Sequence, residues 1–214
     1  MKLYKEVNVC RICGNQDLDI ILEMEDMALT GVFPKNKGEK VPSGPMTLVK
    51  CRESSNNDFC GLVQLRETYD PNLMYGQNYG YRSGLNKSMV SHLNEKVKSI
   101  LNQITLNQDD IVVDIGSNDS TLLQAYPKAK TTLVGFDPTG EKFRKYYPDE
   151  IILFVDFFTS KTFKSKFGNK KAKIITSIAM FYDLDEPLEF VREVFEILSD
   201  DGVWVFEQSY LPSM

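Results

Sequence analysis

The sequence predicts an α/β fold, in which an open, Rossmann-like parallel sheet follows a small β-rich module that a metal ion stabilises. Two patterns in the 214 residues carry this prediction. From residue 111 onward, short apolar runs alternate with amphipathic stretches, which is typical of a parallel sheet with helices on both faces. All four cysteines lie within residues 10–60, among many Gly and Pro residues, and so thin a core needs a metal ion or cross-links.

Composition and charge exclude several classes of protein. With 42% hydrophobic and 26% charged residues, the chain is typical of a globular protein. Its net charge of −5 predicts no general basic surface, so we expect no nucleic-acid partner. No apolar run approaches the roughly 18–20 residues of a membrane span, and the first residues hold no apolar stretch of signal-peptide length. We therefore expect no membrane contact, a cytoplasmic location, and cysteines that bind metal or stay as thiols.

The four cysteines are the predicted zinc ligands. Cys10 and Cys13 make a CxxC knuckle, and Cys51 and Cys60 supply a second pair of thiols. Together they can close a tetrahedral zinc site, whose role is structural because no coordination position stays open for a substrate. The second pair is not a CxxC motif, so the loop formed by residues 52–59 must bulge outward.

Two alternatives to the zinc site stay open. A redox-active CxxC motif normally opens a helix after a strand, and Gly14 followed by Asn15 does not favour a helix there. Four unrelated buried thiols are the other alternative. Short extended stretches at residues 47–50 and 62–65 indicate small β-ribbons, and the module is expected to span residues 1–70.

Residues 71–108 join the module to the sheet. A segment rich in Gly and Tyr, residues 75–84, precedes a helix that the one-face spacing of apolar residues predicts over residues 85–104. His92, the one histidine of the chain, lies on this helix beside an apolar residue. We expect it to be a surface residue or a satisfied helix residue rather than a metal ligand.

Residues 109–214 carry the pattern of the parallel sheet. The candidate strands are residues 111–115, 132–136, 151–155, 173–178 and 203–207. Helices are predicted between them, over residues 119–126, 139–147, 160–167 and 187–198. This order predicts that the carboxyl ends of the strands share one edge, where open α/β sheets bind their ligands.

The turn after the first strand of the sheet is the most informative segment. Asp114 lies near the end of this strand, and Gly116 lets the backbone approach a ligand where a Cβ atom would collide. Only the first glycine of a G-x-G-x-x-G fingerprint is present, and a Walker lysine is absent, so a dinucleotide is poorly supported. Asp114, Asn118 and Asp119 instead form an acidic set that suits a cationic or neutral ligand, which fits a sulfonium cofactor without phosphate such as S-adenosylmethionine.

Acidic residues also follow the next two strands. Asp137 ends the second strand, where Rossmann-type proteins bind ribose hydroxyl groups. Asp156 and Phe157 follow the third strand, where an adenine ring can be held. Each acid alone is also compatible with a helix N-cap, Asp119 in particular. Acids at three neighbouring strand ends favour S-adenosylmethionine as the ligand.

With these residues in hand, the chain resembles the sugar C-methyltransferases, which methylate nucleotide-linked deoxysugars. In that family a four-cysteine zinc module precedes a class I methyltransferase domain. The matching segments are Cys10-x-x-Cys13-Gly14 and residues 60–65, 79–84, 114–119, 177–184 and 206–211. The resemblance implies that residues 71–108 cover the cofactor, with Tyr81 and Ser83 over it. The full set of candidate cofactor contacts is Tyr81, Ser83, Asp114, Gly116, Ser117, Asn118, Asp119, Asp137, Asp156, Phe157 and Ser177.

The sequence departs from the family pattern at three places. The second cysteine pair is widened, and Ser120 stands where the family usually has Gly, which either crowds the loop or caps a helix. The sequence also stops at Met214 after five candidate strands, whereas a class I methyltransferase sheet has seven. The resemblance implies a general base in a His-Glu-His-x-x-Tyr-Tyr segment beyond Met214, so residues 109–214 are expected to be an incomplete methyltransferase domain.

An incomplete sheet predicts a fragment, or a split enzyme in which a second chain completes the sheet, because residues 203–207 would otherwise form an open apolar edge. The isolated chain is expected to bind S-adenosylmethionine weakly and to turn over poorly. The activity implied for the intact enzyme is C-methylation of a nucleotide-linked keto-deoxysugar. The alternatives are methyl transfer to another small-molecule acceptor, at oxygen, nitrogen or carbon, and a non-catalytic protein that binds zinc and S-adenosylmethionine.

Overall fold

The computed structural model describes residues 3–29, 34–53, 59–76, 79–127, 131–210 and 213. Two compact units make up the chain: Met1–Gly80 with Asp185–Leu188, and Tyr81–Leu184 with Glu189–Met214. Most of the bulge predicted for residues 52–59, and part of the linker predicted for residues 75–84, lie outside the described residues.

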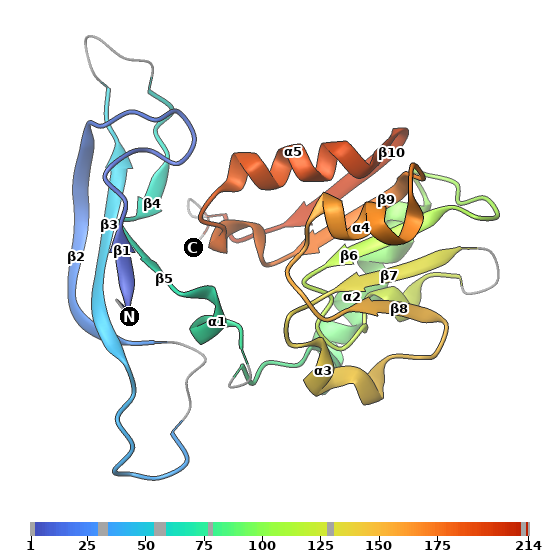
Figure 1. The fold of residues 1–214 in the computed structure, drawn as a ribbon, viewed down its shortest axis with the longest axis horizontal. Helices are drawn as coiled ribbons and strands as arrows, with labels where there is room; N and C mark the ends of the chain where they lie inside the picture. Colours follow the sequence, from blue (N-terminus) through green and yellow to red (C-terminus); the bar gives the residue numbers. More distant parts are fainter. Residues whose placement is uncertain are drawn as a thin grey trace. The chain divides into compact units, whose positions relative to one another are not determined.

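The first unit is built on antiparallel strands (Figure 1). Its elements are β1 (Tyr4–Glu6), β2 (Leu18–Ala28), β3 (Ser43–Cys51), β4 (Val63–Leu65), β5 (Glu67–Tyr69) and the short helix α1 (Pro71–Met74). One sheet has the order β2-β3-β4, and β1 pairs with β5. Leu48 pairs with Leu65, so the ribbons predicted at residues 47–50 and 62–65 are confirmed. β2 is a further strand that the sequence pattern does not predict, and its side chains are nearly all exposed.

The second unit contains a five-stranded sheet in which every neighbouring pair of strands is parallel. Its strands are β6 (Ile111–Ile115), β7 (Thr132–Phe136), β8 (Ile151–Phe154), β9 (Ala172–Ile178) and β10 (Leu198–Glu207). They lie in the order β10-β9-β6-β7-β8, so the direction in which successive strands are added switches between β6 and β9. All five residues of β6 are buried, as expected for a strand covered on both faces. The predicted Rossmann-like α/β sheet is confirmed.

Helices cover both faces of this sheet (Figure 1). They are α2 (Lys87–Leu101), α3 (Gly140–Phe143), α4 (Ser160–Phe167) and α5 (Pro187–Ile197). On one face, Leu93 and Val97 of α2 belong to a buried apolar cluster, and on the other, Phe163 of α4 and Val194 of α5 belong to a second one. Asn86 caps α2, because its side chain accepts a hydrogen bond from the first turn of the helix.

The helix predicted over residues 119–126 is wrong, because only the 3-10 turn Leu123–Ala125 forms there. Asn118 and Ser120 adopt left-handed φ values of 49° and 64°. Left-handed residues cannot belong to a right-handed helix, so the segment that enters this turn is a loop. The helix predicted over residues 139–147 is also shorter than expected, since α3 passes into a 3-10 turn.

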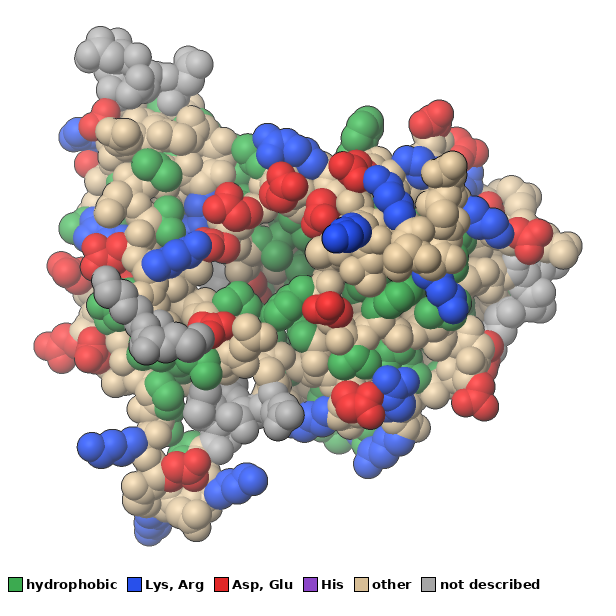
Figure 2. All heavy atoms as spheres, viewed as in Figure 1, with side chains coloured by type: hydrophobic (Ala, Val, Ile, Leu, Met, Phe, Trp, Pro, Cys, Tyr) green, Lys and Arg blue, Asp and Glu red, His purple; other side chains and the backbone are tan. Residues whose placement is uncertain are grey.

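The surface carries charges of both signs. Figure 2 shows Lys and Arg side chains mixed with Asp and Glu side chains over the face in view. That face does not present the continuous basic area with which proteins bind nucleic acid. Within the described part of the chain, no helix has both the length and the apolar character that crossing a membrane requires.

Candidate functional site

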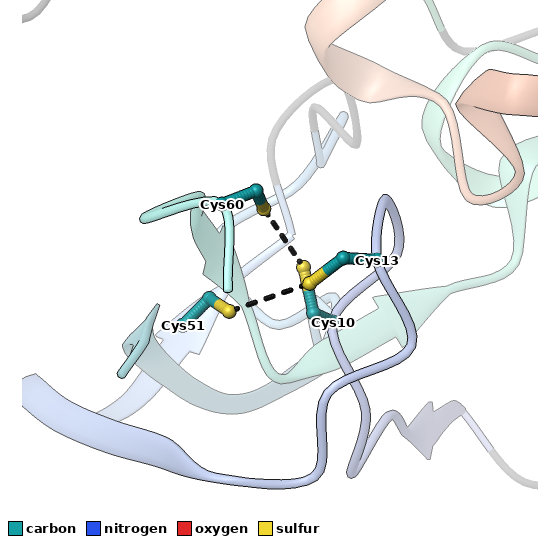
Figure 3. Close-up of side chains that lie close together, drawn as sticks. All are labelled: Cys10, Cys13, Cys51 and Cys60. Carbon is teal, nitrogen blue, oxygen red and sulfur yellow. Dashed lines mark hydrogen bonds between the residues drawn. The ribbon is translucent and has the colours of Figure 1, made fainter. Parts of the chain in front are cut away.

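The first unit brings the four cysteines together (Figure 3). All four Sγ atoms lie within 4.8 Å of one another, with 3.4 Å between those of Cys10 and Cys60 and 3.6 Å between those of Cys13 and Cys51. Tetrahedral Zn–S bonds of about 2.3 Å place thiolate sulfur atoms roughly 3.8 Å apart, so this arrangement fits a zinc ion with four thiolate ligands.

Backbone contacts shape the knuckle that presents the first two thiols. The Cys10 N–H donates to the Asn15 carbonyl oxygen at 2.8 Å, and Gly14 adopts a φ of 74°, which suits a residue without a Cβ atom. The Asn15 side chain reaches the second pair, since its Nδ2 lies 3.4 Å from the Cys51 Sγ. Hydrogen bonds from the Cys60 backbone and then from Asn15 lower the pKa of the Cys51 thiol, which favours the thiolate form that binds metal.

In the second unit, the switch in strand order marks the place where an open α/β sheet binds its ligand. Gly116 follows β6 there, and Met180 follows β9. Gly116 has a φ of 77°, and a Cβ atom at this position would lie 3.4 Å from Cγ of Met180. The backbone after β6 therefore lies at van der Waals distance from the loop after β9, and the close approach of a ligand to Gly116 stays a prediction.

The loop formed by residues 116–120, called the cofactor loop below, uses its own N–H groups internally. The N–H groups of Gly116 and Ser117 donate to the Phe136 carbonyl oxygen at 2.8 and 3.2 Å. The Asn118 N–H donates to Oδ2 of Asp137 at 2.7 Å. Phosphate-binding loops point such N–H groups at the ligand, whereas here they are already bonded. This bonding disfavours a dinucleotide and is compatible with a cofactor that carries no phosphate.

Asp137, just after β7, is the buried centre of this arrangement. One carboxylate oxygen accepts the Asn118 N–H, and the other accepts the Thr139 N–H at 2.7 Å as well as the Thr139 hydroxyl group. The carboxylate therefore fixes the cofactor loop to the end of β7, at the position where Rossmann-type proteins bind ribose.

Asp114 lies inside β6 rather than at the edge of the sheet. Its side chain is buried, and Oδ1 accepts a hydrogen bond from the Thr176 hydroxyl group at 2.6 Å. Burial raises the pKa of Asp114 to about 7, the Thr176 hydrogen bond opposes this shift, and the nearby Asp137 adds to it. Asp114 is predicted to contact the cofactor, and this contact stays a prediction, because the carboxyl group is buried against Thr176.

Replacing Asp114 with asparagine is expected to change how stability depends on pH. The folded-state pKa of about 7 lies above the ordinary value of 3.8, so the wild-type chain loses stability as the pH rises between these values. Relative to Asp114→Asn, the wild-type free energy of unfolding should fall by roughly 2–3 kcal/mol between pH 5 and pH 8. Urea unfolding of both proteins at the two pH values measures this difference, and parallel pH curves would contradict the assignment.

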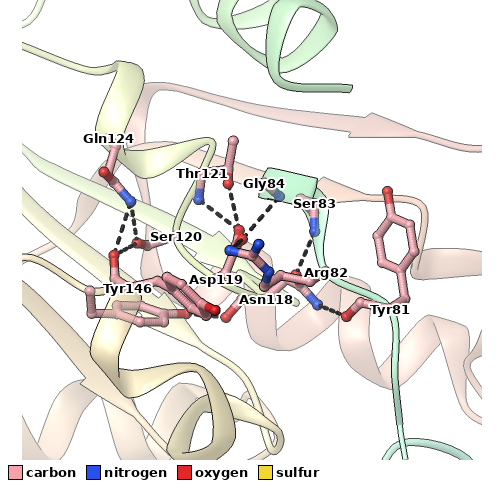
Figure 4. A network of polar contacts seen from close by, with 11 residues as sticks. Tyr81, Arg82, Ser83, Gly84, Asn118, Asp119, Ser120, Thr121, Gln124 and Tyr146 are labelled. Carbon is pink, nitrogen blue, oxygen red and sulfur yellow. Dashed lines mark hydrogen bonds and ion pairs between the residues drawn. The ribbon is translucent and has the colours of Figure 1, made fainter. Parts of the chain in front are cut away.

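Asn118 and Asp119 hold a neighbouring segment rather than facing open solvent (Figure 4). Oδ1 of Asn118 accepts the Ser83 N–H at 2.9 Å, and its Nδ2 donates to the Tyr81 carbonyl oxygen at 3.1 Å. Oδ2 of Asp119 accepts the Gly84 N–H at 2.9 Å. Residues 81–84, called the strap below, are thereby fixed to the cofactor loop.

The other predicted contacts differ in their exposure. Ser177 is buried, and its hydroxyl group accepts the Trp204 Nε1–H at 2.9 Å. Asp156 and Phe157 are exposed after β8, and Phe157 keeps 40% of its surface accessible. Of these residues, only the last two are open at the strand ends, where an adenine ring can pack.

Three residues that contact the predicted site residues directly were not predicted from the sequence. Tyr147 contacts the hydroxyl group of Ser117 at 2.8 Å, and Thr176 bonds to Asp114. Arg82 belongs to a segment that the sequence analysis singled out, yet its pairing with Asp119 at 3.5 Å was not foreseen. A tyrosine between strands carries no pattern that could have marked it.

His92 forms a pair with the carboxylate of Glu207 and does not belong to the cysteine cluster. Its Nε2 lies 2.9 Å from Oε1 of Glu207, and Lys96 reaches the other oxygen of the same carboxylate at 2.7 Å. With 44% of its side chain exposed, His92 is a surface helix residue with a carboxylate partner.

Comparisons with known proteins agree with this architecture. A family model described as “Methyltransferase domain” matches residues 89–213. The chain belongs to this family. A second model, described as “Putative zinc binding domain”, matches residues 10–75, which contain all four cysteines. The predicted fold and the predicted cofactors, S-adenosylmethionine and Zn²⁺, are confirmed by this combination of a methyltransferase domain with a four-cysteine zinc module.

The individual proteins to which this methyltransferase chain is similar share less than a quarter of their aligned residues with it. It is 24% identical over 217 residues to the C-methyltransferase NovU of Streptomyces niveus. The alignment covers 98% of this chain and 49% of NovU. The chain thus spans about half the length of this relative.

Two solved structures are also similar in part. The structure described as “Complex between the Haloferax volcanii Trm112 methyltransferase activator and the putative methyltransferase” gives a TM-score of 0.45 at 21% identity, covering 57% of this chain and 55% of that chain. The plantazolicin methyltransferase BpumL, in complex with a pentazolic desmethylPZN analog and SAH, gives a TM-score of 0.48 at 16% identity. The match covers 59% of this chain and 50% of the BpumL chain.

Proposed function

We propose that this protein transfers a methyl group from S-adenosylmethionine to a carbon atom of a nucleotide-linked keto-deoxysugar. The observation that carries the proposal is the alignment with a C-methyltransferase over nearly the whole chain, including both the cysteine module and the sheet. The motifs shared with the sugar C-methyltransferases, from the CxxC knuckle to residues 206–211, support the same acceptor class.

The donor is proposed to bind across the carboxyl ends of β6, β7 and β8. Asp137 already accepts three hydrogen bonds from the protein, and its remaining acceptor position would bind a ribose hydroxyl group. Asp156 with the exposed ring of Phe157 would hold the adenine. The methionine part would lie along the backbone at Gly116, under the strap that includes Tyr81. A hydrogen bond to a carboxylate contributes about 1.5–3 kcal/mol, so the ribose contact would raise the affinity for the donor about ten- to a hundredfold.

The remaining predicted contacts are proposed to shape this site rather than to touch the donor. Asn118 and Asp119 hold the strap, Ser117 contacts a neighbouring tyrosine, and Ser177 holds Trp204. The pKa of the buried Asp114 is about 7, so its carboxyl group would be protonated and uncharged at low pH.

The sulfonium supplies an electrophilic methyl group, which a carbanion next to the 4-keto group of the sugar would attack. The residues of this chain would align the two reactants, and alignment alone lowers the barrier of such transfers by several kcal/mol. Within the described residues we assign no general base for the sugar proton.

Methyl transfer from ¹³C-labelled S-adenosylmethionine to a nucleotide-linked 4-keto-6-deoxysugar tests the proposal. The expected product gains one methyl group, and its ¹³C chemical shift places that group on carbon. A methyl group on oxygen or nitrogen would overturn C-methylation. Donor binding without transfer to this sugar would favour a different acceptor or a non-catalytic binding protein.

A further inference from the structure

We propose that Tyr147 is a positioning residue, which holds the cofactor loop in its binding shape before the donor arrives. The proposal rests on the proposed function of the loop as the donor site. The Tyr147 hydroxyl group donates to the Asn118 carbonyl oxygen at 2.8 Å and lies 2.8 Å from the hydroxyl group of Ser117. One phenol therefore touches two consecutive residues of the loop.

The cofactor loop needs such support because its backbone is strained. Asn118 and Ser120 have φ values of 49° and 64°, in a region that glycine adopts freely and other residues rarely do. Neither residue is a glycine, so the loop keeps this shape only where surrounding contacts fix it. The contacts of Tyr147 fall on the first of the two strained residues and on the residue before it.

The residue next to Tyr147 supports the second strained residue (Figure 4). The Ser120 hydroxyl group donates to the Tyr146 carbonyl oxygen at 3.2 Å, and Nε2 of Gln124 donates to both oxygen atoms, at 2.9 and 3.1 Å. Ser120 is fully buried. The serine that replaces the usual glycine of the family is thus accommodated by hydrogen bonds to this turn, and it does not cap a helix.

The same turn is linked to the strap. The Arg82 guanidinium lies 4.1 Å from the centre of the Tyr146 ring and 3.5 Å from Oδ2 of Asp119. The loop is therefore held from two sides, by the strap and by residues 146–147, and the two supports contact each other. A site that is already in its bound shape loses less conformational entropy on binding, so these contacts raise donor affinity without touching the donor.

Tyr147→Phe and Tyr126→Phe form a matched pair that tests this role. Both tyrosines lie in the apolar cluster that includes α2, but the buried Tyr126 hydroxyl group has no hydrogen-bond partner among the described residues. Calorimetric titration of the zinc-loaded chain with S-adenosylhomocysteine measures the dissociation constant. We expect Tyr147→Phe to weaken binding about tenfold or more, and Tyr126→Phe to bind within twofold of wild type.

Two further readouts separate positioning from general loss of stability. Hydrogen exchange should accelerate at the cofactor-loop amides of Tyr147→Phe and stay unchanged in β8 and β9. In a double-mutant cycle with Ser117→Ala, the two affinity losses should be less than additive, because both changes remove the same contact.

Unchanged affinity of Tyr147→Phe, or an equal loss in Tyr126→Phe, would overturn the role of Tyr147 and leave the proposed function intact. Absence of binding to the wild-type chain would instead overturn the proposed donor site, and the role of Tyr147 with it.

Discussion

Removal of zinc is expected to unfold the first unit while the second unit stays folded. Among its described residues, the first unit buries few large apolar side chains, and two of the buried residues are the ligands Cys10 and Cys51. Zinc binding by four thiolates is worth about 10–16 kcal/mol in small zinc-binding peptides, far more than so thin a core supplies. Chelation with EDTA should therefore abolish the far-ultraviolet circular dichroism of the antiparallel strands.

Trp204, the one tryptophan of the chain, lies in β10 of the second unit and serves as an internal control. Its fluorescence should stay unchanged during chelation, and added Zn²⁺ but not Mg²⁺ should restore the dichroism. Cys13→Ala is expected to lower the zinc content below one ion per chain. Protein that holds no zinc after purification, or that keeps its full dichroism in EDTA, would contradict the metal site.

Loss of the Asp137 carboxylate is expected to have the largest effect on the donor site. Asp137→Ala removes the proposed ribose acceptor and leaves the buried N–H groups of Asn118 and Thr139 without their partner. Each unpaired group costs about 1–3 kcal/mol, so the loop should lose its shape as well as its ligand contact. Affinity for S-adenosylhomocysteine should fall at least a hundredfold by calorimetric titration.

Two companion variants make this experiment specific. Asp137→Asn keeps one acceptor oxygen and should bind with intermediate affinity, whereas Asp149→Ala removes an exposed carboxylate before β8 and should bind like wild type. Circular dichroism of each variant verifies that the sheet is folded. Wild-type affinity of a folded Asp137→Ala protein would show that the donor binds elsewhere.

The sheet was predictable because its strands are buried on both faces and stand out as continuous apolar runs, such as residues 111–115. β2 was not predictable, because the alternation of apolar and acidic residues is interrupted at Ile21 and after Glu25, where the register with β3 shifts. The false helix at residues 119–126 has a physical cause as well. Its residues favour a helix locally, but the contacts of Asn118 and Ser120 with distant residues stabilise left-handed backbone.

The candidate site was predictable where a residue type carries the chemistry. The four thiols predict the metal site, and Gly116 after a buried strand predicts a ligand at that turn. The role of each polar side chain was not predictable, because a sequence does not show which oxygen atoms already accept hydrogen bonds within the protein. Asn118 holds the strap and Asp114 lies under the loop for reasons that exist only in three dimensions, as does the contact of Tyr147.

A crystal structure of the zinc-loaded chain with S-adenosylhomocysteine tests the donor site most directly. We expect the ribose hydroxyl groups within hydrogen-bond distance of Asp137, the adenine against Phe157, and the sulfur atom near Gly116 at the switch between β6 and β9. A ligand bound away from the carboxyl ends of the strands, with Asp137 bonded only to the protein, would contradict the assignment.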